Sequence, residues 1–279
     1  YIYSTDNREK LEQEMQALES IGAKAEFAEN LPLPFPTVGA VKFPHQAQFH
    51  PLKFAAGISK NLKIYEHSKV CEMTEYLALT ERGSVTAEKV IIATHFPFIN
   101  MWGFYGVKLH PYQTYQLAVR NKKRLQGMYF EADNLGLGIR NFQEYLILGE
   151  SGGRTQSRKT SRDRIRKNSW DTLKEIANEY FPGSFEQYSF QTWDYRSLDQ
   201  RPYIGQYSRS TPDLYVAAGF EKWGMTGAML SAMILSDLVL EKENEYKKIF
   251  SPLRNPITPE LFANIGYALA GAFKSKKNM

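Results

Sequence analysis

Cysteine is almost absent from this sequence of 279 residues, because Cys71 is the single one. One thiol excludes an internal disulfide framework and suits a reducing compartment, so we expect a cytoplasmic protein. Long apolar runs are also missing. The most hydrophobic stretch, residues 225–240, contains four threonine, serine or aspartate residues, which makes it too short and too polar to span a bilayer. We expect a buried helix there and no membrane span.

Groups of metal ligands are missing as well. The five histidines are scattered without the spacing of a metal site, and a single cysteine cannot hold an iron–sulfur cluster. We therefore predict no metal in this chain.

The sequence also has no Gly-x-Gly-x-x-Gly pattern, the loop that seats the pyrophosphate of a dinucleotide on a helix N-terminus. It begins without a methionine or a signal-peptide pattern. Residues 1–6 have instead the pattern of a strand that leads into a helix N-cap. We therefore expect a chain entered in mid-fold, whose N-terminal unit is missing.

The residues that are present suit a globular protein of one or two domains, with 43% hydrophobic and 23% charged residues. The net charge is +5, and the isoelectric point is near 9.0. Residues 154–167 carry most of the excess, with seven basic side chains and one acidic. We interpret them as the solvated start of a helix that continues to Tyr180. Because no aromatic side chains alternate with these charges, nucleic-acid binding is disfavoured.

The pattern along the chain changes twice. Helical spacing follows Asn7 as far as Gly22, a proline-rich connector lies at residues 31–36, and residues 51–59 are expected to be helical. Short strand-like runs separated by turns then predict an antiparallel sheet. A long helix from Trp223 to about Lys242 precedes a tail with one amphipathic helix. Strands are expected at residues 62–73, 76–79, 87–94, 112–119, 127–131, 136–140, 145–148, 188–195 and 214–218.

Together these elements predict an α+β fold. Residues 50–100 and 212–242 supply pieces of a parallel α/β layer, in which the uniformly apolar run 90–93 suits a strand buried on both faces. The antiparallel sheet is inserted between these pieces.

The strongest local signal for a site lies at residues 214–227, where an apolar strand passes through small residues and a glycine into the long helix. The free N–H groups of a helix start suit an electron-rich ligand atom, although a tight turn without a ligand is the alternative. Two weaker signals accompany it. The strand 87–94 ends in Ala93 and Thr94, small residues that let a ligand approach the backbone. Residues 193–205 gather charged and aromatic side chains around a turn.

Taken in this order, these segments resemble the D-amino-acid oxidase / glycine oxidase superfamily of flavoproteins over residues 1–245. Residues 22–26 (Gly-Ala-Lys-Ala-Glu) and 48–51 (Gln-Phe-His-Pro) are also similar to early stretches of that family. Residues 193–205 and the Lys-Trp-Gly-Met-Thr turn at 222–226 are most similar to a bacterial branch often fused to a Rieske iron–sulfur domain. Such a domain would lie outside this chain.

The resemblance implies FAD as the cofactor. In the family, the turn at 222–226 lies under the flavin with its helix start aimed at the pyrimidine carbonyl. The turn at 202–205 passes near the ring, and His95 stands where members carry glycine, which predicts an altered turn. The cofactor-binding residues that the resemblance implies are Val70, Ala93, Thr94, Pro202, Ile204, Gly205, Trp223, Gly224, Met225 and Thr226.

Two arginines are the expected substrate residues. Arg196 falls close to the carboxylate-binding arginine of glycine-oxidase-like proteins, and its guanidinium can pair with both oxygens of a substrate carboxylate. Arg140, between two strand-like runs, either faces the substrate or is an exposed arginine of the sheet. No base is nominated, because the substrate can bind as the neutral amine.

The function implied is that of an FAD-dependent oxidoreductase that oxidises the C–N bond of an amino acid or amine, with a Rieske domain or another electron acceptor outside this chain. Residues 46–105 and 196–245 would form an incomplete FAD-binding domain, residues 1–45 and 106–195 a substrate domain, and residues 246–279 a helical tail. The chain alone is expected to be inactive. The alternative is a flavin-free remnant of the fold that acts as a basic interaction domain.

Overall fold

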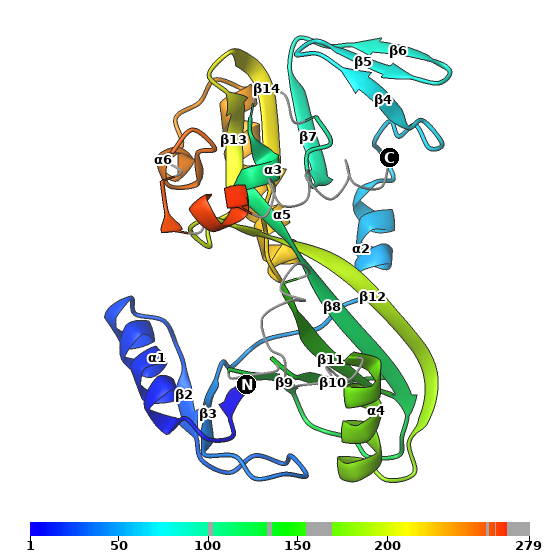
Figure 1. Cartoon of the computed structure of the whole chain (residues 1–279), viewed down its shortest axis with the longest axis vertical. Helices are drawn as coiled ribbons and strands as arrows, with labels where there is room; N and C mark the ends of the chain where they lie inside the picture. Colours follow the sequence, from blue (N-terminus) through cyan, green and yellow to red (C-terminus); the bar gives the residue numbers. More distant parts are fainter. Residues whose placement is uncertain (100–102, 133–135, 155–168, 255–256, 260, 267–279) are drawn as a thin grey trace. The chain divides into compact units, whose positions relative to one another are not determined.

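A computed structural model describes residues 1–99, 103–132, 136–154, 169–254, 257–259 and 261–266. The chain divides into two compact units, which are considered separately (Figure 1). The first unit contains residues 1–60 and 113–193, and the second contains residues 61–112 and 194–279. These limits differ from those of the expected domains, and the roles expected of the domains stay predictions.

The first unit is built on an eight-stranded sheet with the order β12-β8-β11-β10-β9-β1-β3-β2. Neighbours β9, β10 and β11 are antiparallel, as the short strand-like runs predict. At the N-terminus, β1 pairs in parallel with β9 and antiparallel with β3. The strands are β1 (Ile2–Ser4), β2 (Glu26–Ala28), β3 (Gly39–Lys42), β8 (Leu109–Arg120), β9 (Met128–Glu131), β10 (Gly138–Phe142), β11 (Tyr145–Arg154) and β12 (Phe185–Ser197).

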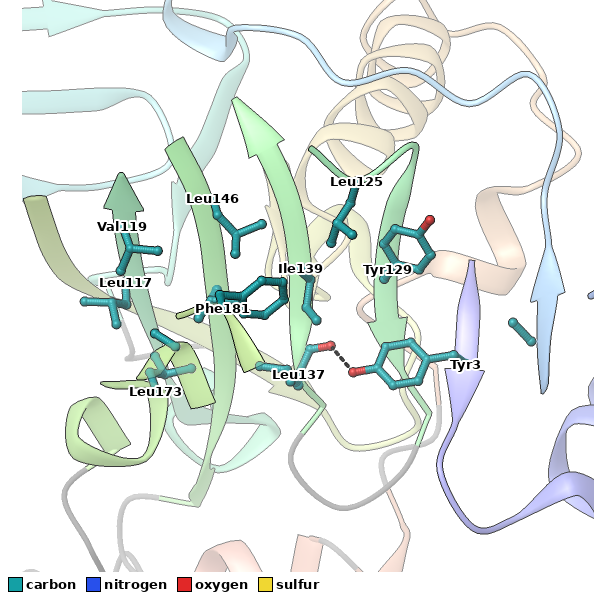
Figure 2. Packing of buried hydrophobic residues seen from close by; sticks show 13 residues of the cluster. Tyr3, Leu117, Val119, Leu125, Tyr129, Leu137, Ile139, Leu146, Leu173 and Phe181 are labelled. Carbon is teal, nitrogen blue, oxygen red and sulfur yellow. Dashed lines mark hydrogen bonds between the residues drawn. The ribbon is translucent and has the colours of Figure 1, made fainter. Parts of the chain in front are cut away.

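Helix α4 (Ser169–Tyr180) packs on this sheet and closes its core. Figure 2 shows Leu173 and Phe181 beside the side chains of the central strands, among them Ile139 and Leu146. The Tyr3 hydroxyl donates a hydrogen bond to the Leu137 carbonyl at 3.4 Å, so this buried polar group has a partner. Helix α1 (Arg8–Ser20) begins after Asn7, whose side chain accepts a hydrogen bond from the Lys10 backbone.

The second unit contains a three-stranded sheet of β13 (Tyr203–Ser208), β14 (Thr211–Ala218) and β7 (Val90–His95), in that order. β14 runs parallel to β7 and antiparallel to β13. Helix α5 (Gly224–Val239) covers one face of β13 and β14 (Figure 1) and buries Ile234 and Leu235 against them. The other face buries Ile92 and Val216 with three tyrosines, Tyr105, Tyr203 and Tyr207.

A second sheet of this unit is an antiparallel meander of β4 (Val70–Met73), β5 (Leu77–Thr80) and β6 (Gly83–Thr86). The short helices are α2 (Pro51–Ile58) in the first unit and α3 (Tyr105–Lys108) and α6 (Lys247–Phe250) in the second. Residues 261–266 are helical as well, within the amphipathic stretch expected in the tail.

Three expectations about local structure are wrong. The turn expected at residues 202–205 is the start of β13, because Pro202 directly precedes the strand, where no N–H is needed, and Tyr203 pairs with Ala218. β7 is not buried on both faces, since it is an edge strand of the described sheet and Ile91 is 44% exposed. The strand expected from residue 62 begins only at Val70. The basic run at 154–167 falls almost wholly outside the described residues.

Candidate active site

The start of α5 forms one wall of the candidate site. β14 ends at Ala218, and the chain turns into α5 within five residues through Gly219, which has a φ of 75°. A Cβ at Gly219 would lie 2.8 Å from Leu109, so both the backbone and the packing require glycine. Trp223 is the N-cap and offers no side-chain hydrogen bond to the first turn. The helix start is therefore open to an electron-rich ligand atom.

Space for a ligand exists at the same place. Outside its own helix and chain neighbours, no heavy atom lies within 4 Å of where a Cβ of Gly224 would stand. Gly227, one turn further along, would by contrast place a Cβ 2.4 Å from Phe220. Trp223 is 68% exposed and Met225 is 45% exposed. A flat apolar ring system can thus settle on the helix start, with backbone N–H groups beneath it, which fits a flavin.

The end of β7 lies at the same edge of the sheet. Because β7 and β14 are parallel, their carboxyl ends coincide, and Ala218 pairs with His95. Ala93 and Thr94 are exposed there. His95 has a φ of 65°, a value that favours glycine, and its ring packs 5.1 Å from that of Tyr195. The structure thus places the small residues of β7 and the start of α5 together, and the altered turn expected at His95 is a strained one.

Arg196 is brought to this edge as the second-last residue of β12. Its backbone forms a β-bridge with Phe220, in the turn between β14 and α5. Its guanidinium carbon lies 4.9 Å from the ring centroid of Tyr112, and its Nε lies 3.8 Å from Oε2 of Glu221. Glu221 is absent from the sequence-based predictions, because nothing in the sequence distinguishes it from an ordinary surface glutamate.

Glu221 has two unusual features. Its φ is 55°, although it carries a side chain. Its Oε1 is buried and has no hydrogen-bond partner among the described residues. Burial raises the pKa of this carboxyl group, and the nearby Arg196 opposes the rise.

Asp199 and Arg254 fix the connection from β12 to β13. The guanidinium of Arg254 donates to both carboxylate oxygens of Asp199 at 2.7 and 2.6 Å, and to the carbonyls of Arg201 and Pro202 at 2.6 and 3.2 Å. It also lies 4.0 Å from the ring centroid of Tyr203. Burial alone would raise the pKa of Asp199, but Arg254 and Arg201 outweigh it and lower the pKa to about 2. We call this Arg254–Asp199 pair the clamp. The sequence did not predict it, because 55 residues separate the two side chains.

The remaining predicted residues are spread over both units. Pro202 lies at the same sheet edge, but the side chain of Ile204 is fully buried under α5 and offers no surface to a ligand. A Cβ at Gly205 would lie 3.2 Å from Pro252. Val70 begins β4 and belongs to the meander, a different sheet from that of β14. Its neighbour Cys71 helps to line a cavity of about 420 Å³, together with residues of the meander and Phe98 and Ile99.

Arg140 belongs to the first unit, on β10. Its Nη1 donates to Oε1 of Gln48 at 3.1 Å, and burial lowers the pKa of its guanidinium. It is therefore a half-buried, hydrogen-bonded arginine. Whether it contacts substrate stays a prediction.

Comparison with known proteins identifies the family. Residues 1–238 match the family model described as FAD dependent oxidoreductase (DAO). The chain belongs to this family. A curated relative from Bacillus subtilis (strain 168), YhfW, carries a name that assigns it to Rieske 2Fe-2S iron-sulfur proteins. It is 29% identical over 283 residues, and the match covers 96% of this chain but 55% of the relative. The chain thus spans about half the length of this relative.

Solved structures of two oxidoreductases share the fold. Glycine oxidase from Geobacillus kaustophilus superposes with a TM-score of 0.72 at 21% identity, and the match covers 91% of this chain and 74% of that chain. L-proline dehydrogenase from P. horikoshii gives a TM-score of 0.68 at 17% identity, covering 91% and 75%. The glycine-oxidase-like α+β fold predicted from the sequence is therefore confirmed.

Two further observations concern the described part of the chain. None of its helices is long and apolar enough to cross a membrane. Within the same residues, no three side chains of histidine, cysteine, aspartate or glutamate come together as metal ligands would.

Proposed function

We propose that the protein to which this chain belongs is an FAD-dependent oxidoreductase that oxidises the C–N bond of an amino acid or amine. The observation that carries the proposal is the open start of α5 beside the exposed end of β7. Membership of the DAO family supports FAD as the cofactor. Arg196, a cation at the same edge, supports a substrate with a carboxylate.

Four residues of the α5 start would hold the flavin: Trp223, Gly224, Met225 and Thr226. When bound, FAD supplies an acceptor for the hydride equivalent from the carbon next to the substrate nitrogen. The backbone N–H groups at the helix start would stabilise negative charge on a bound flavin, since the helix dipole places partial positive charge there. Ala93 and Thr94 contribute small side chains that leave the backbone of β7 accessible.

The substrate carboxylate would bind to Arg196. A guanidinium carries five donors in a planar fork, and its pairing with a carboxylate is bidentate and directional. The ring of Tyr112 supports one face of this fork. Orientation of the α-carbon is then the main task of the protein, because a substrate bound as the neutral amine needs no strong base.

We further infer that the electrons leave for an acceptor outside this chain. The support is the name of the Bacillus subtilis relative, together with the part of that relative that this chain does not match. A Rieske cluster in the same polypeptide would be such an acceptor.

Anaerobic mixing of the natural full-length protein with a panel of amino acids and amines tests the proposal. We expect yellow protein with the absorption spectrum of an oxidised flavin, and bleaching of that spectrum by at least one amino acid. Full-length protein that is folded and colourless, or flavin that no member of the panel reduces, would contradict it.

A further inference from the structure

The backbone at Glu221 is held in an unfavourable conformation at the edge of the site. Its φ of 55° lies in the left-handed region, where a side chain is disfavoured and glycine is not. Its N–H donates to the Tyr195 carbonyl at 3.1 Å, which ties the turn before α5 to the end of β12. Strained backbone of this kind is concentrated at functional sites.

The carboxylate of Glu221 points toward Arg196. Oε2 lies 3.8 Å from Nε of Arg196, and the glutamate side chain is 21% exposed. The other oxygen, Oε1, is buried without a hydrogen bond from any described residue. A buried carboxylate oxygen without a hydrogen bond lowers the stability of the folded state. Glu221 is therefore not explained by a contribution to folding stability.

The contacts of Arg196 leave one edge of its guanidinium free. Glu221 lies on the Nε side, and the ring of Tyr112 covers one face at 4.9 Å. No described residue hydrogen-bonds to Nη1 or Nη2, and the side chain is 41% exposed. A guanidinium held in this way presents its two terminal nitrogens to an incoming carboxylate.

We propose that Glu221 is a positioning residue, which holds the guanidinium of Arg196 through Nε so that Nη1 and Nη2 bind the carboxylate of an amino-acid substrate. This inference rests on the proposed function. It adds that discrimination between an amino acid and the corresponding amine depends on the Glu221–Arg196 pair. Because Glu221 itself does not touch the substrate, its effect acts only through Arg196.

Steady-state kinetics of the full-length holoenzyme test the proposal with Glu221→Gln, Arg196→Ala and the double variant. The substrates are the amino acid that reduces the flavin fastest and its decarboxylated amine. We expect Glu221→Gln to raise KM for the amino acid about tenfold, with kcat within about twofold and the amine unaffected. In the Arg196→Ala background, the same substitution should have no further effect.

Two further variants separate positioning from folding. Glu221→Gly removes the carboxylate and relieves the positive φ, so it should keep or raise the melting temperature while it raises KM as Glu221→Gln does. Glu243→Gln removes an exposed carboxylate of the same unit, paired with Lys247, and should leave the kinetics unchanged.

Three results would overturn the inference: equal losses with both substrates, additive losses in the double variant, or no change on Glu221→Gln while Arg196→Ala has its full effect. Failure of the proposed function looks different, since wild-type flavin would then be reduced by neither substrate.

Discussion

At the scale of single residues, the candidate site depends on one cation and one glycine. Arg196 is held by Glu221 and Tyr112 and keeps an accessible edge. Gly224 has open space in front of the position that a side chain would take. We expect substitution of Arg196 to weaken substrate binding and substitution of Gly224 to weaken FAD binding.

Arg196→Ala should raise KM for an amino-acid substrate by roughly 10- to 100-fold, which corresponds to about 1.4–2.8 kcal/mol of binding free energy. The reason is that the substrate carboxylate would lose its paired cation. Activity on the decarboxylated amine should change much less. Arg209→Ala, at an exposed position in the same unit, is the matched control. Equal loss on both substrates would instead assign Arg196 to flavin binding or to folding.

Gly224→Val should weaken FAD binding by about tenfold or more, because the added side chain would fill the space above the helix start. The measurement is the ratio of flavin to protein absorbance after gel filtration of the full-length protein. Gly266→Val is the control, since Gly266 also lies in helical backbone with open space around its Cβ position but belongs to the tail, beyond the last residue that matches the family. Unchanged flavin content in folded Gly224→Val would show that the ring does not rest there.

At the scale of secondary-structure elements, the clamp of Arg254 on Asp199 connects the tail to the β12–β13 turn. The Arg254 side chain is 11% exposed and that of Asp199 is 20% exposed. Removal of Arg254 leaves the half-buried Asp199 with Arg201 as its remaining cation, and it also removes the hydrogen bonds that Arg254 donates to four backbone carbonyls.

Arg254→Met should therefore lower the free energy of unfolding by roughly 3 kcal/mol, and with it the melting temperature. Lys248→Met, an exposed lysine of α6, should have little effect and serves as the control. Equal melting temperatures for Arg254→Met and the wild type would contradict a stabilising clamp.

The clamp also predicts a dependence of stability on pH. The pKa of Asp199 is lowered from 3.8 to about 2, so the pair stabilises the folded state fully above pH 4 and less as the pH falls toward 2. The difference in melting temperature between the wild type and Asp199→Asn should shrink over this range. A difference that stays constant down to pH 2 would mean that the carboxylate charge does not contribute.

The elements that frame the site were predictable because their signals are local. The apolar run of β14, the glycine turn and the mostly apolar α5 all appear within residues 211–239. Glu221 was not predictable, since its φ contradicts the preference of its residue type. β13 was missed because Pro202 and Gly205 are typical of a turn, whereas pairing with β14 determines the strand. The clamp joins residues far apart in the sequence, which periodicity cannot detect.

At the scale of the whole molecule, the chain lacks one sequence motif that FAD binding requires. The chain matches the FAD dependent oxidoreductase family over residues 1–238, yet its sequence has no glycine-rich pyrophosphate loop. The diphosphate of FAD needs such a loop on a helix N-terminus.

We therefore predict that the 279-residue chain, expressed alone, carries little or no FAD and has no amine-oxidising activity. Absorbance at the flavin wavelengths after purification, with and without added FAD, measures this directly. The full-length protein, treated in parallel, is the control. A stoichiometric flavin content in the isolated chain would show that the residues of the second unit bind the cofactor unaided.

Arg254 lies beyond residue 238, the last residue that matches the family model, whereas its partner Asp199 lies within the match. The end of the family match is therefore not the end of the folded unit. A chimera joined to a relative at residue 238 would keep Asp199 and its ion pair with Arg201 but would lose Arg254. A chimera between this chain and a relative should therefore be joined C-terminal to residue 254. The β12–β13 turn then keeps Arg254, which binds Asp199 and two carbonyls of the turn.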